Sequence, residues 1–209
     1  GINYRPLDLT GVHVSNSFVG EKTVEWDYPL PAISIRYTTD GTVPDANSKL
    51  YTAPFTINET TDFTIRLFRP DGSAADIIKT SYRKEEYIAG EEQGDKVPGV
   101  KVEWREAIVR KSADIEEHPV KAEFIVNKII IPEGVTNHKQ AMKYYGYLKV
   151  DNDDIYTFSL GSDDGSMLYI NDEVVVDNDG PHGPRTLRGQ KALGKGYHPF
   201  VLYYFDMNN

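Results

Sequence analysis

The stretch DNDDIYTFSLGSDDGSMLYINDEVVVDND, Asp151–Asp179, decides the fold of the second half of this chain. Tyr156, Phe158 and Leu160 alternate with small polar residues, the period of two that gives a strand one apolar face in an antiparallel sheet. The strand ends at Ser162–Gly165, where two adjacent aspartates stand before a glycine that tolerates the backbone of a tight turn. We therefore expect a strand that runs into an acidic corner.

The chain leaves this corner directly into a predicted hairpin. Met167–Ile170 is apolar enough for a second strand, and Asn171 and Asp172 are residue types that favour a two-residue hairpin turn. Val174–Val176 then returns antiparallel and ends at a second acidic corner, Asp177–Gly180. This order of strands and tight turns is typical of an antiparallel all-β domain.

Length and composition bound the fold and the class of partner. The chain has 209 residues, 39% hydrophobic and 26% charged, which suits two small folded domains. It contains no cysteine, so disulfides, zinc–thiolate sites and cysteine nucleophiles are excluded. A formal net charge of −9 and a pI near 5.0 argue against nucleic-acid binding, which needs a clustered basic surface. No run approaches the ~20 apolar residues of a spanning helix, so we expect no membrane insertion.

The first half of the chain is punctuated by turn signals. Short apolar runs alternate with clusters of Gly, Pro, Asn and Asp, and Asp40–Gly41 and Asp71–Gly72 each follow an apolar run as a tight turn. Pro44, Pro54 and Pro70 fit edges and loops, where no backbone donor is needed. These signals predict a small β-sandwich.

Three segments of this half carry a resemblance to a known domain. IRYTTDGTVP (Ile35–Pro44), SKLYTAPF (Ser48–Phe55) and Phe63–Ser73 follow one another as in the immunoglobulin-like domain at the C-terminal side of chitobiases and β-hexosaminidases, and Tyr82 closes the last strand. The resemblance implies an immunoglobulin/fibronectin-like sandwich over residues 1–83. In that family the domain has no catalytic duty.

Residues 84–98 have the composition of a linker. The segment KEEYIAGEEQGDKVP is charged, broken by glycine and poor in apolar residues. We expect the domain boundary here, with a second domain over residues 99–209. In that domain Val100, Val102 and Trp104 alternate as a first strand.

The order of short motifs in the second half resembles the β-sandwich named after the protective antigen of anthrax toxin, the PA-fourteen domain. The carriers are YGYL (Tyr145–Leu148), IYTF (Ile155–Phe158), SDDGSMLYI (Ser162–Ile170), VVDNDGPHG (Val175–Gly183) and GYHPF (Gly196–Phe200). With the first domain, the resemblance implies an all-β chain of two β-sandwich domains, the second a PA-fourteen-like antiparallel sandwich. The chain stops before the final glycine-led strand of that family, so we expect the second domain to be truncated.

The acidic pair Asp163 and Asp164 is the sharpest candidate for a site. In the sugar-binding members of the PA-fourteen family a cis peptide joins the equivalent pair, and both carboxylates face one Ca²⁺ that holds sugar hydroxyls. The resemblance implies that Asp163 and Asp164 bind calcium and carbohydrate. Since calcium takes about six to eight oxygens, Asp177, Asn178 and Asp179 are candidates for further ligands if their corner folds beside the first. The alternative is a structural corner whose aspartates accept backbone N–H groups.

Other candidates for carbohydrate contact are a histidine and the aromatic residues. His182, in the run Gly-Pro-His-Gly-Pro, is a candidate sugar contact, with a solvated turn residue as the alternative. Tyrosine and tryptophan offer stacking surfaces, but most fall on strand patterns where they serve as core, and we expect Trp104 in the core.

Motifs for catalysis are absent from the sequence, which has no His-Glu-x-x-His, no Gly-x-Ser-x-Gly, no phosphate loop and no dinucleotide fingerprint. We therefore expect no catalytic residues. The two resembled domains occur together on glycoside hydrolases, which implies a non-catalytic accessory region of a secreted glycoside hydrolase resembling β-N-acetylhexosaminidases. Such a region would either bind glycan or shape the substrate site of the parent enzyme. Its expected partners are a glycan and the catalytic domain of the parent chain, and its expected location is secreted, periplasmic or on a bacterial surface. The alternative is an adhesin or lectin module with no enzyme attached.

Overall fold

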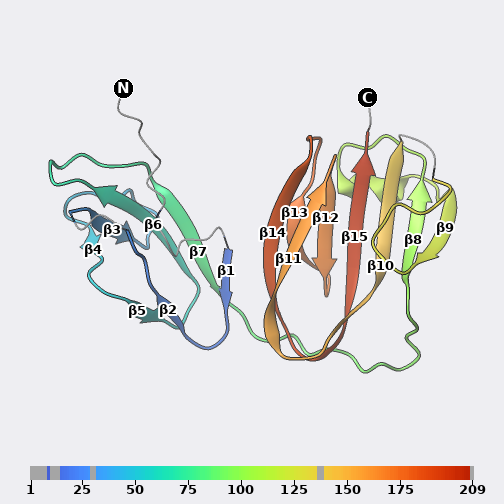
Figure 1. Ribbon diagram of the computed structural model, residues 1–209, viewed down its shortest axis with the longest axis horizontal. Coiled ribbons are helices and arrows are strands. Elements are labelled where there is room, and N and C mark those ends of the chain that lie inside the picture. The colour runs from blue at the N-terminus through green and yellow to red at the C-terminus, as the bar shows by residue number, and fades with distance from the viewer. Residues whose placement is uncertain (1–8, 10–14, 29–31, 136–138, 208–209) are drawn as a thin grey trace. The chain divides into compact units, whose positions relative to one another are not determined.

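The structure is a computed structural model that describes residue 9 and residues 15–28, 32–135 and 139–207 (Figure 1). The chain divides into two compact units, Gly1–Glu86 and Tyr87–Asn209. Within the described residues both units are built from strands, and one short 3-10 helix is the only helix. The prediction of an all-β chain with two domains is confirmed. No helix among the described residues is long and apolar enough to cross a membrane.

The first unit contains two sheets. One has five strands in the order β1-β7-β6-β3-β4, and the other pairs β2 with β5. The pair of β1 and β7 is parallel, and the other pairs are antiparallel. The strands are β1 Ser15–Phe18, β2 Lys22–Val24, β3 Ser34–Thr38, β4 Lys49–Leu50, β5 Phe55–Ile57, β6 Thr61–Phe68 and β7 Ile78–Lys84.

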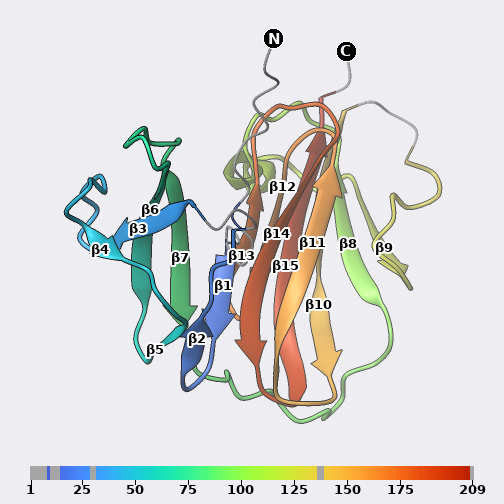
Figure 2. The same ribbon diagram turned by 60° about the vertical axis from the view of Figure 1, so that its left-hand side comes forward.

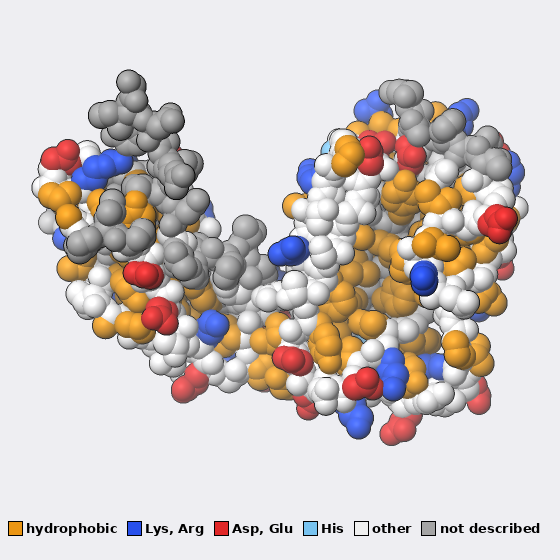
Figure 3. Space-filling view, viewed as in Figure 1, with side chains coloured by type: hydrophobic (Ala, Val, Ile, Leu, Met, Phe, Trp, Pro, Cys, Tyr) orange, Lys and Arg blue, Asp and Glu red, His pale blue; other side chains and the backbone are white. Residues whose placement is uncertain are grey.

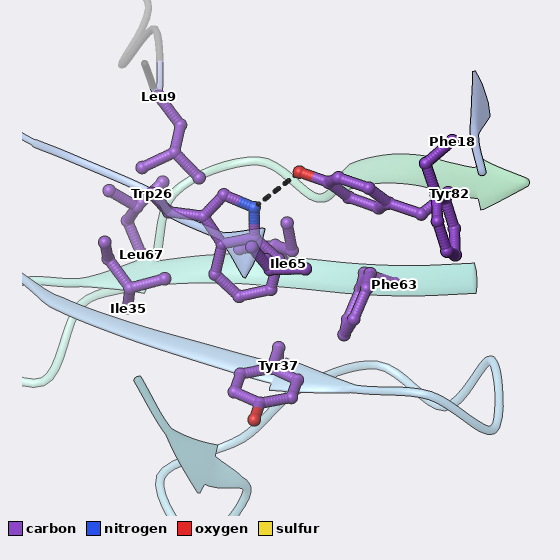
Figure 4. Close-up of a cluster of buried hydrophobic side chains, with 10 residues drawn as sticks. Leu9, Phe18, Trp26, Ile35, Tyr37, Phe63, Ile65, Leu67 and Tyr82 are labelled. Atoms are coloured by element: carbon purple, nitrogen blue, oxygen red, sulfur yellow. Dashed lines mark hydrogen bonds between the residues drawn. The ribbon is translucent and has the colours of Figure 1, made fainter. Parts of the chain in front are cut away.

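Trp26 is central to the buried cluster of the first unit (Figure 4). Its ring lies edge-on to Tyr37 and Phe63, with centroids 5.2 and 5.0 Å apart, a geometry that aromatic pairs favour. The indole Nε1 donates a 3.2 Å hydrogen bond to the Tyr82 hydroxyl. Ile35 and Tyr37 are both buried on alternate positions of β3, as the period of two requires.

The second unit combines a six-stranded sheet, in the order β13-β12-β15-β10-β8-β9, with a two-stranded sheet of β11 and β14, all antiparallel. In Figure 2 β14 and β11 lie in front of β15 and β10. The elements are β8 Val100–Arg105, η1 Ser112–Glu117, β9 Ala122–Val126, β10 Gln140–Val150, β11 Asp154–Ser162, β12 Ser166–Ile170, β13 Glu173–Asn178, β14 Arg185–Leu193 and β15 Gly196–Asp206.

Alternation along the strands gives the six-stranded sheet an inner and an outer face. Met142 and Tyr144 of β10 are buried in the core with Trp104 of β8, which is 6% exposed and confirms the core prediction for that tryptophan. Lys143 and Tyr145 of β10 face the opposite way and are half-buried. The outer face therefore carries polar and aromatic side chains.

Hydrophobic side chains also gather at the surface of the second unit (Figure 3). The loop after β9 exposes Ile129, Ile130 and Ile131 by 46–54%. At one end of the outer face, by contrast, the segment that includes η1 buries a small cluster of Ala107, Val109, Ile115, Ala141 and Phe205. Sequence patterns gave no prediction for this η1 segment, because it is polar and irregular.

The turn between β12 and β13 has the predicted geometry. Asn171 and Asp172 adopt positive φ values of 50° and 62°, and Ile170 pairs with Glu173 across them. Two consecutive residues with positive φ form the hairpin turn whose twist matches that of the strands. The two-residue hairpin prediction is confirmed.

The segment expected to be a linker, 84–98, is divided between the units. β7 extends to Lys84, and the second unit begins at Tyr87. Glu91 and Tyr197 exchange two backbone hydrogen bonds of 2.8 and 3.0 Å, so this part of the segment adds to the edge of the second domain. The second domain therefore begins earlier than residue 99.

Two glycines allow this close approach. A Cβ built at Gly90 would lie 2.5 Å from the Cα of Gly196, and Gly196 has a φ of +134° that favours glycine. Both contacts are between backbones. This segment therefore pairs with β15 through its backbone, which its charged composition does not indicate.

Candidate functional site

The acidic corner after β11 opens onto a cavity of about 610 Å³. The carboxylates of Asp163 and Asp164 line it, and the peptide bond between them is cis. Asp206, at the end of β15, adds a third carboxylate. The remaining lining comes from Pro181, His182, Gly183 and Met207. Three segments that are distant in sequence therefore meet at one acidic cavity.

Asp164 ties two of these segments to the corner. One carboxylate oxygen accepts a 3.0 Å hydrogen bond from the backbone N–H of His182, and the other accepts one of 3.0 Å from the backbone N–H of Met207. Hydrogen bonds to an ionised acceptor are stronger than those between neutral groups. Asp164 thus accepts backbone N–H groups, as expected for an aspartate with a structural role in a corner.

Asp163 is exposed and is held through its backbone. Its carbonyl oxygen accepts a 3.1 Å hydrogen bond from the hydroxyl of Tyr204. Burial, helped by the nearby Asp206 carboxylate, raises the pKa of Tyr204 to about 12, so this donor keeps its proton at neutral pH. The Asp163 carboxylate is therefore presented to the cavity from a fixed backbone.

Asn178, expected as a ligand, has a structural role instead. Its side chain is fully buried. Its Nδ2 donates to the Ser162 hydroxyl at 2.9 Å and to the Arg185 carbonyl at 3.3 Å, and its Oδ1 accepts from Arg185 Nε at 2.7 Å. The amide thus joins the ends of β11, β13 and β14 through contacts within the protein.

The second acidic corner is also committed to hydrogen bonds within the protein. The Asp179 carboxylate accepts hydrogen bonds from the backbone N–H and the hydroxyl of Ser112, at 2.9 and 2.8 Å. Asp177 accepts one of 3.1 Å from the backbone N–H of Asp179. The structure therefore does not bring this corner beside Asp163 and Asp164 as a common set of ligands.

A calcium ion needs more than this arrangement supplies, because it takes about six to eight oxygen ligands. Across the described residues, no three His, Cys, Asp or Glu side chains form a group that could hold a metal ion. Both carboxylate oxygens of Asp164 already accept backbone N–H groups. The acidic side chains alone therefore do not complete a calcium site, and calcium binding at this corner stays a prediction.

His182 lies at the cavity, as the sequence predicts for a contact residue. Its ring Nδ1 is 2.7 Å from the carbonyl oxygen of Gly183, and its Nε2 is 2.9 Å from that of Asn178. Both partners are acceptors, and a neutral imidazole carries one N–H, so the ring donates to one of these two carbonyls at a time. The ring can offer its apolar face to a ligand.

Asp206 and Met207 line the acidic cavity but were not predicted from the sequence. β12 leaves the acidic corner and pairs with β15, with Ser166 opposite Tyr204, and this register carries the end of β15 to the cavity. Asp206 is the last residue of β15, so the register of that strand is the signal that would have placed it.

Replacing Asp164 with alanine is expected to lower the free energy of unfolding of the second unit by about 1–3 kcal/mol, because two backbone N–H groups lose their acceptor. Asp163→Ala is the matched control and should change it by less than about 0.5 kcal/mol, as for an exposed side chain. Urea unfolding of both variants measures the difference. Equal losses in the two variants would show that the two bonds of Asp164 are not what holds the loops.

Comparison with solved structures finds several distant similarities. An anti-sigma factor domain-containing protein is 16% identical, with a TM-score of 0.47, and the match covers 84% of this chain and 67% of that one. The PA14 domain of the MpAFP antifreeze protein is 17% identical, with a TM-score of 0.46 and coverages of 56% and 81%. A beta-glucosidase from Kluyveromyces marxianus is 16% identical, with a TM-score of 0.41 and coverages of 55% and 15%. None of the curated proteins matches the chain.

Comparison with family models finds two matches that together span most of the chain. Residues 14–79 match the chitobiase/beta-hexosaminidase C-terminal domain, and residues 89–209 match the PA14 domain. Both are non-catalytic accessory domains, and both resemblances seen in the sequence are confirmed. The second match covers more than half of the chain and includes the whole acidic cavity. The chain therefore belongs to the PA14 domain family.

Proposed function

We propose that this chain is the carbohydrate-binding accessory region of a secreted bacterial glycoside hydrolase of the β-N-acetylhexosaminidase type. The observation that carries the proposal is the order of its two domains, a chitobiase/beta-hexosaminidase C-terminal domain followed by a PA14 domain. In this proposal the catalytic domain lies elsewhere in the parent chain. The accessory region keeps the enzyme close to its glycan.

The glycan contact is assigned to the cavity at Asp163, Asp164 and His182. The exposed Asp163 carboxylate offers acceptor oxygens, and sugars are rich in hydroxyl donors. A hydroxyl bound to a carboxylate forms a short, charge-assisted hydrogen bond. The proposed contact is direct, with no calcium ion between the carboxylate and the sugar.

A glycan array tests the contact. The full chain, assayed in EDTA, is expected to bind a subset of glycans, and Asp163→Asn to weaken that binding by about tenfold or more, the loss for a charged group that carries binding energy. Glu117→Gln, at an exposed carboxylate outside the cavity, is the matched control and should bind as the wild type does. Binding that is lost in EDTA, or that is equal in the Asp163 variant, contradicts direct recognition by this carboxylate.

The parent gene tests the assignment to an enzyme. We expect the same reading frame to encode a catalytic barrel. A hexosaminidase barrel needs about 250 residues in addition to the two domains described. A wall anchor or repeat stalk with no catalytic domain would favour the adhesin alternative and contradict the proposal.

A further inference from the structure

The outer face of the six-stranded sheet carries a second cavity, of about 770 Å³, that shares no lining residue with the acidic cavity. Tyr145 and Tyr147 of β10 and Tyr197 of β15 line it. Tyr145 and Tyr147 are two positions apart, so both face the outer side of the sheet. We call this feature the tyrosine cleft.

The rims of the tyrosine cleft are unusually exposed hydrophobic side chains. Val97 is 81% exposed and Ile125 is 73% exposed, the two highest values among the large hydrophobic side chains that the structure describes. Tyr147 is 47% exposed. Single exposed apolar residues need no explanation, but their concentration around one cavity marks a binding surface.

The cleft is already formed in the free protein. Lys96 Nζ is 2.8 Å from a carboxylate oxygen of Glu91, donates a 3.0 Å hydrogen bond to the Glu92 carbonyl, and lies 4.3 Å from the centre of the Tyr147 ring. The two backbone hydrogen bonds between Glu91 and Tyr197 fix the same wall to β15. A ligand therefore meets a preorganised wall and loses little free energy in ordering it.

The polar groups at the cleft define the chemistry of its ligand. Gln93, Asp95 and Lys101 line it together with Lys96, whose charge is balanced by Glu91. Both signs of charge and an amide are present, so a strongly charged ligand gains no general attraction. The aromatic rings favour a flat apolar surface, and the polar side chains favour hydroxyl or amide groups around it.

We propose that the tyrosine cleft binds a neutral oligosaccharide, independently of the Asp163 cavity. Lys96 covers one face of the Tyr147 ring, and the C–H face of a pyranose ring can lie on the exposed side of this tyrosine. The equatorial hydroxyls of the sugar can then reach Gln93 and Lys101. The cavity volume of about 770 Å³ lies within the range of pockets that bind small molecules. The choice of a glycan rests on the proposed function, whereas the site rests on the cleft alone.

Isothermal titration calorimetry on the full chain tests this site with two probes, the tetrasaccharides chitotetraose and cellotetraose. Tyr147→Ala is expected to weaken binding of at least one probe by about tenfold or more, since exposed tyrosines that anchor a ligand carry much of its binding energy. Val97→Asp should do the same by placing a charge on the apolar rim. Val174→Asp, at a 48% exposed valine outside the cleft, is the matched control and should bind normally.

The Asp163→Asn variant separates this proposal from the proposed function. Probe binding that survives in Asp163→Asn and is lost in both cleft variants supports binding in the tyrosine cleft and contradicts binding of the probe at Asp163. Binding that is lost in Asp163→Asn and unchanged in both cleft variants overturns the cleft and leaves the proposed function standing. The absence of heat with either probe at millimolar concentration, while a glycan from the array still binds through Asp163, likewise overturns the cleft.

Discussion

Replacing Trp26 with alanine is expected to lower the free energy of unfolding of the first unit by about 3–5 kcal/mol, the range for a large buried aromatic side chain. Trp26 is 3% exposed and contacts Tyr37, Tyr51, Phe55 and Phe63. The variant removes these contacts and leaves a cavity that rigid sheets cannot fill. A domain of this size has only about 5–15 kcal/mol of stability, so the loss is a large fraction of it.

Hydrogen exchange in the full chain measures this effect locally. Amides of β6 in the Trp26→Ala variant should lose most of their protection, while amides of β15, in the other unit, serve as an internal reference. Val43→Ala, at a 54% exposed valine of the same unit, should leave β6 protection unchanged. Similar exchange of β6 in the Trp26 and Val43 variants would mean that the aromatic cluster does not hold this unit together.

Replacing Gly189 with alanine is expected to destabilise the second unit by about 3 kcal/mol or more, at the upper end of the cost of overpacking. A Cβ at Gly189 would lie 1.8 Å from the carbonyl oxygen of Val175 and 2.8 Å from its carbonyl carbon. These are backbone atoms of β13, so no side-chain rotation relieves the clash. β14 would have to move away from β13, where the two sheets of the unit meet.

Gly183→Ala is the matched control for this prediction, because a Cβ there meets no atom within 4 Å. Urea unfolding followed by circular dichroism should give a midpoint near that of the wild type for Gly183→Ala and a much lower one for Gly189→Ala. A Gly189 variant as stable as the Gly183 variant would contradict the close approach of β13 and β14.

Local patterns in the sequence predicted most of the fold. Alternation assigned the inward faces of β8 and β11, and Asn171 and Asp172 identified their turn, because these signals depend on neighbouring residues alone. The role of Gly189 was not predicted. A glycine inside a strand indicates close approach of another backbone, but the sequence does not say which one.

The candidate site was predictable only in part. Asp177 and Asn178 are consecutive residues of β13, so their side chains face opposite sides of the sheet and are poorly placed to bind one ion. The structure buries Asn178 against Arg185. Asp206 depends on the pairing of β12 with β15, which is a long-range contact. The backbone hydrogen bonds between Glu91 and Tyr197 were likewise not predicted, because the composition of a segment gives no information on backbone pairing.

We propose that the second domain recognises glycan through Asp163. A crystal structure of the full chain with the glycan that binds best on the array tests this claim. We expect a sugar hydroxyl within about 2.7–3.0 Å of an Asp163 carboxylate oxygen, at hydrogen-bond distance. We also expect His182 and Asp164 in their present positions, with the backbone N–H of His182 bonded to the Asp164 carboxylate. A saturating glycan bound elsewhere on the chain, with only water beside Asp163, would contradict the claim.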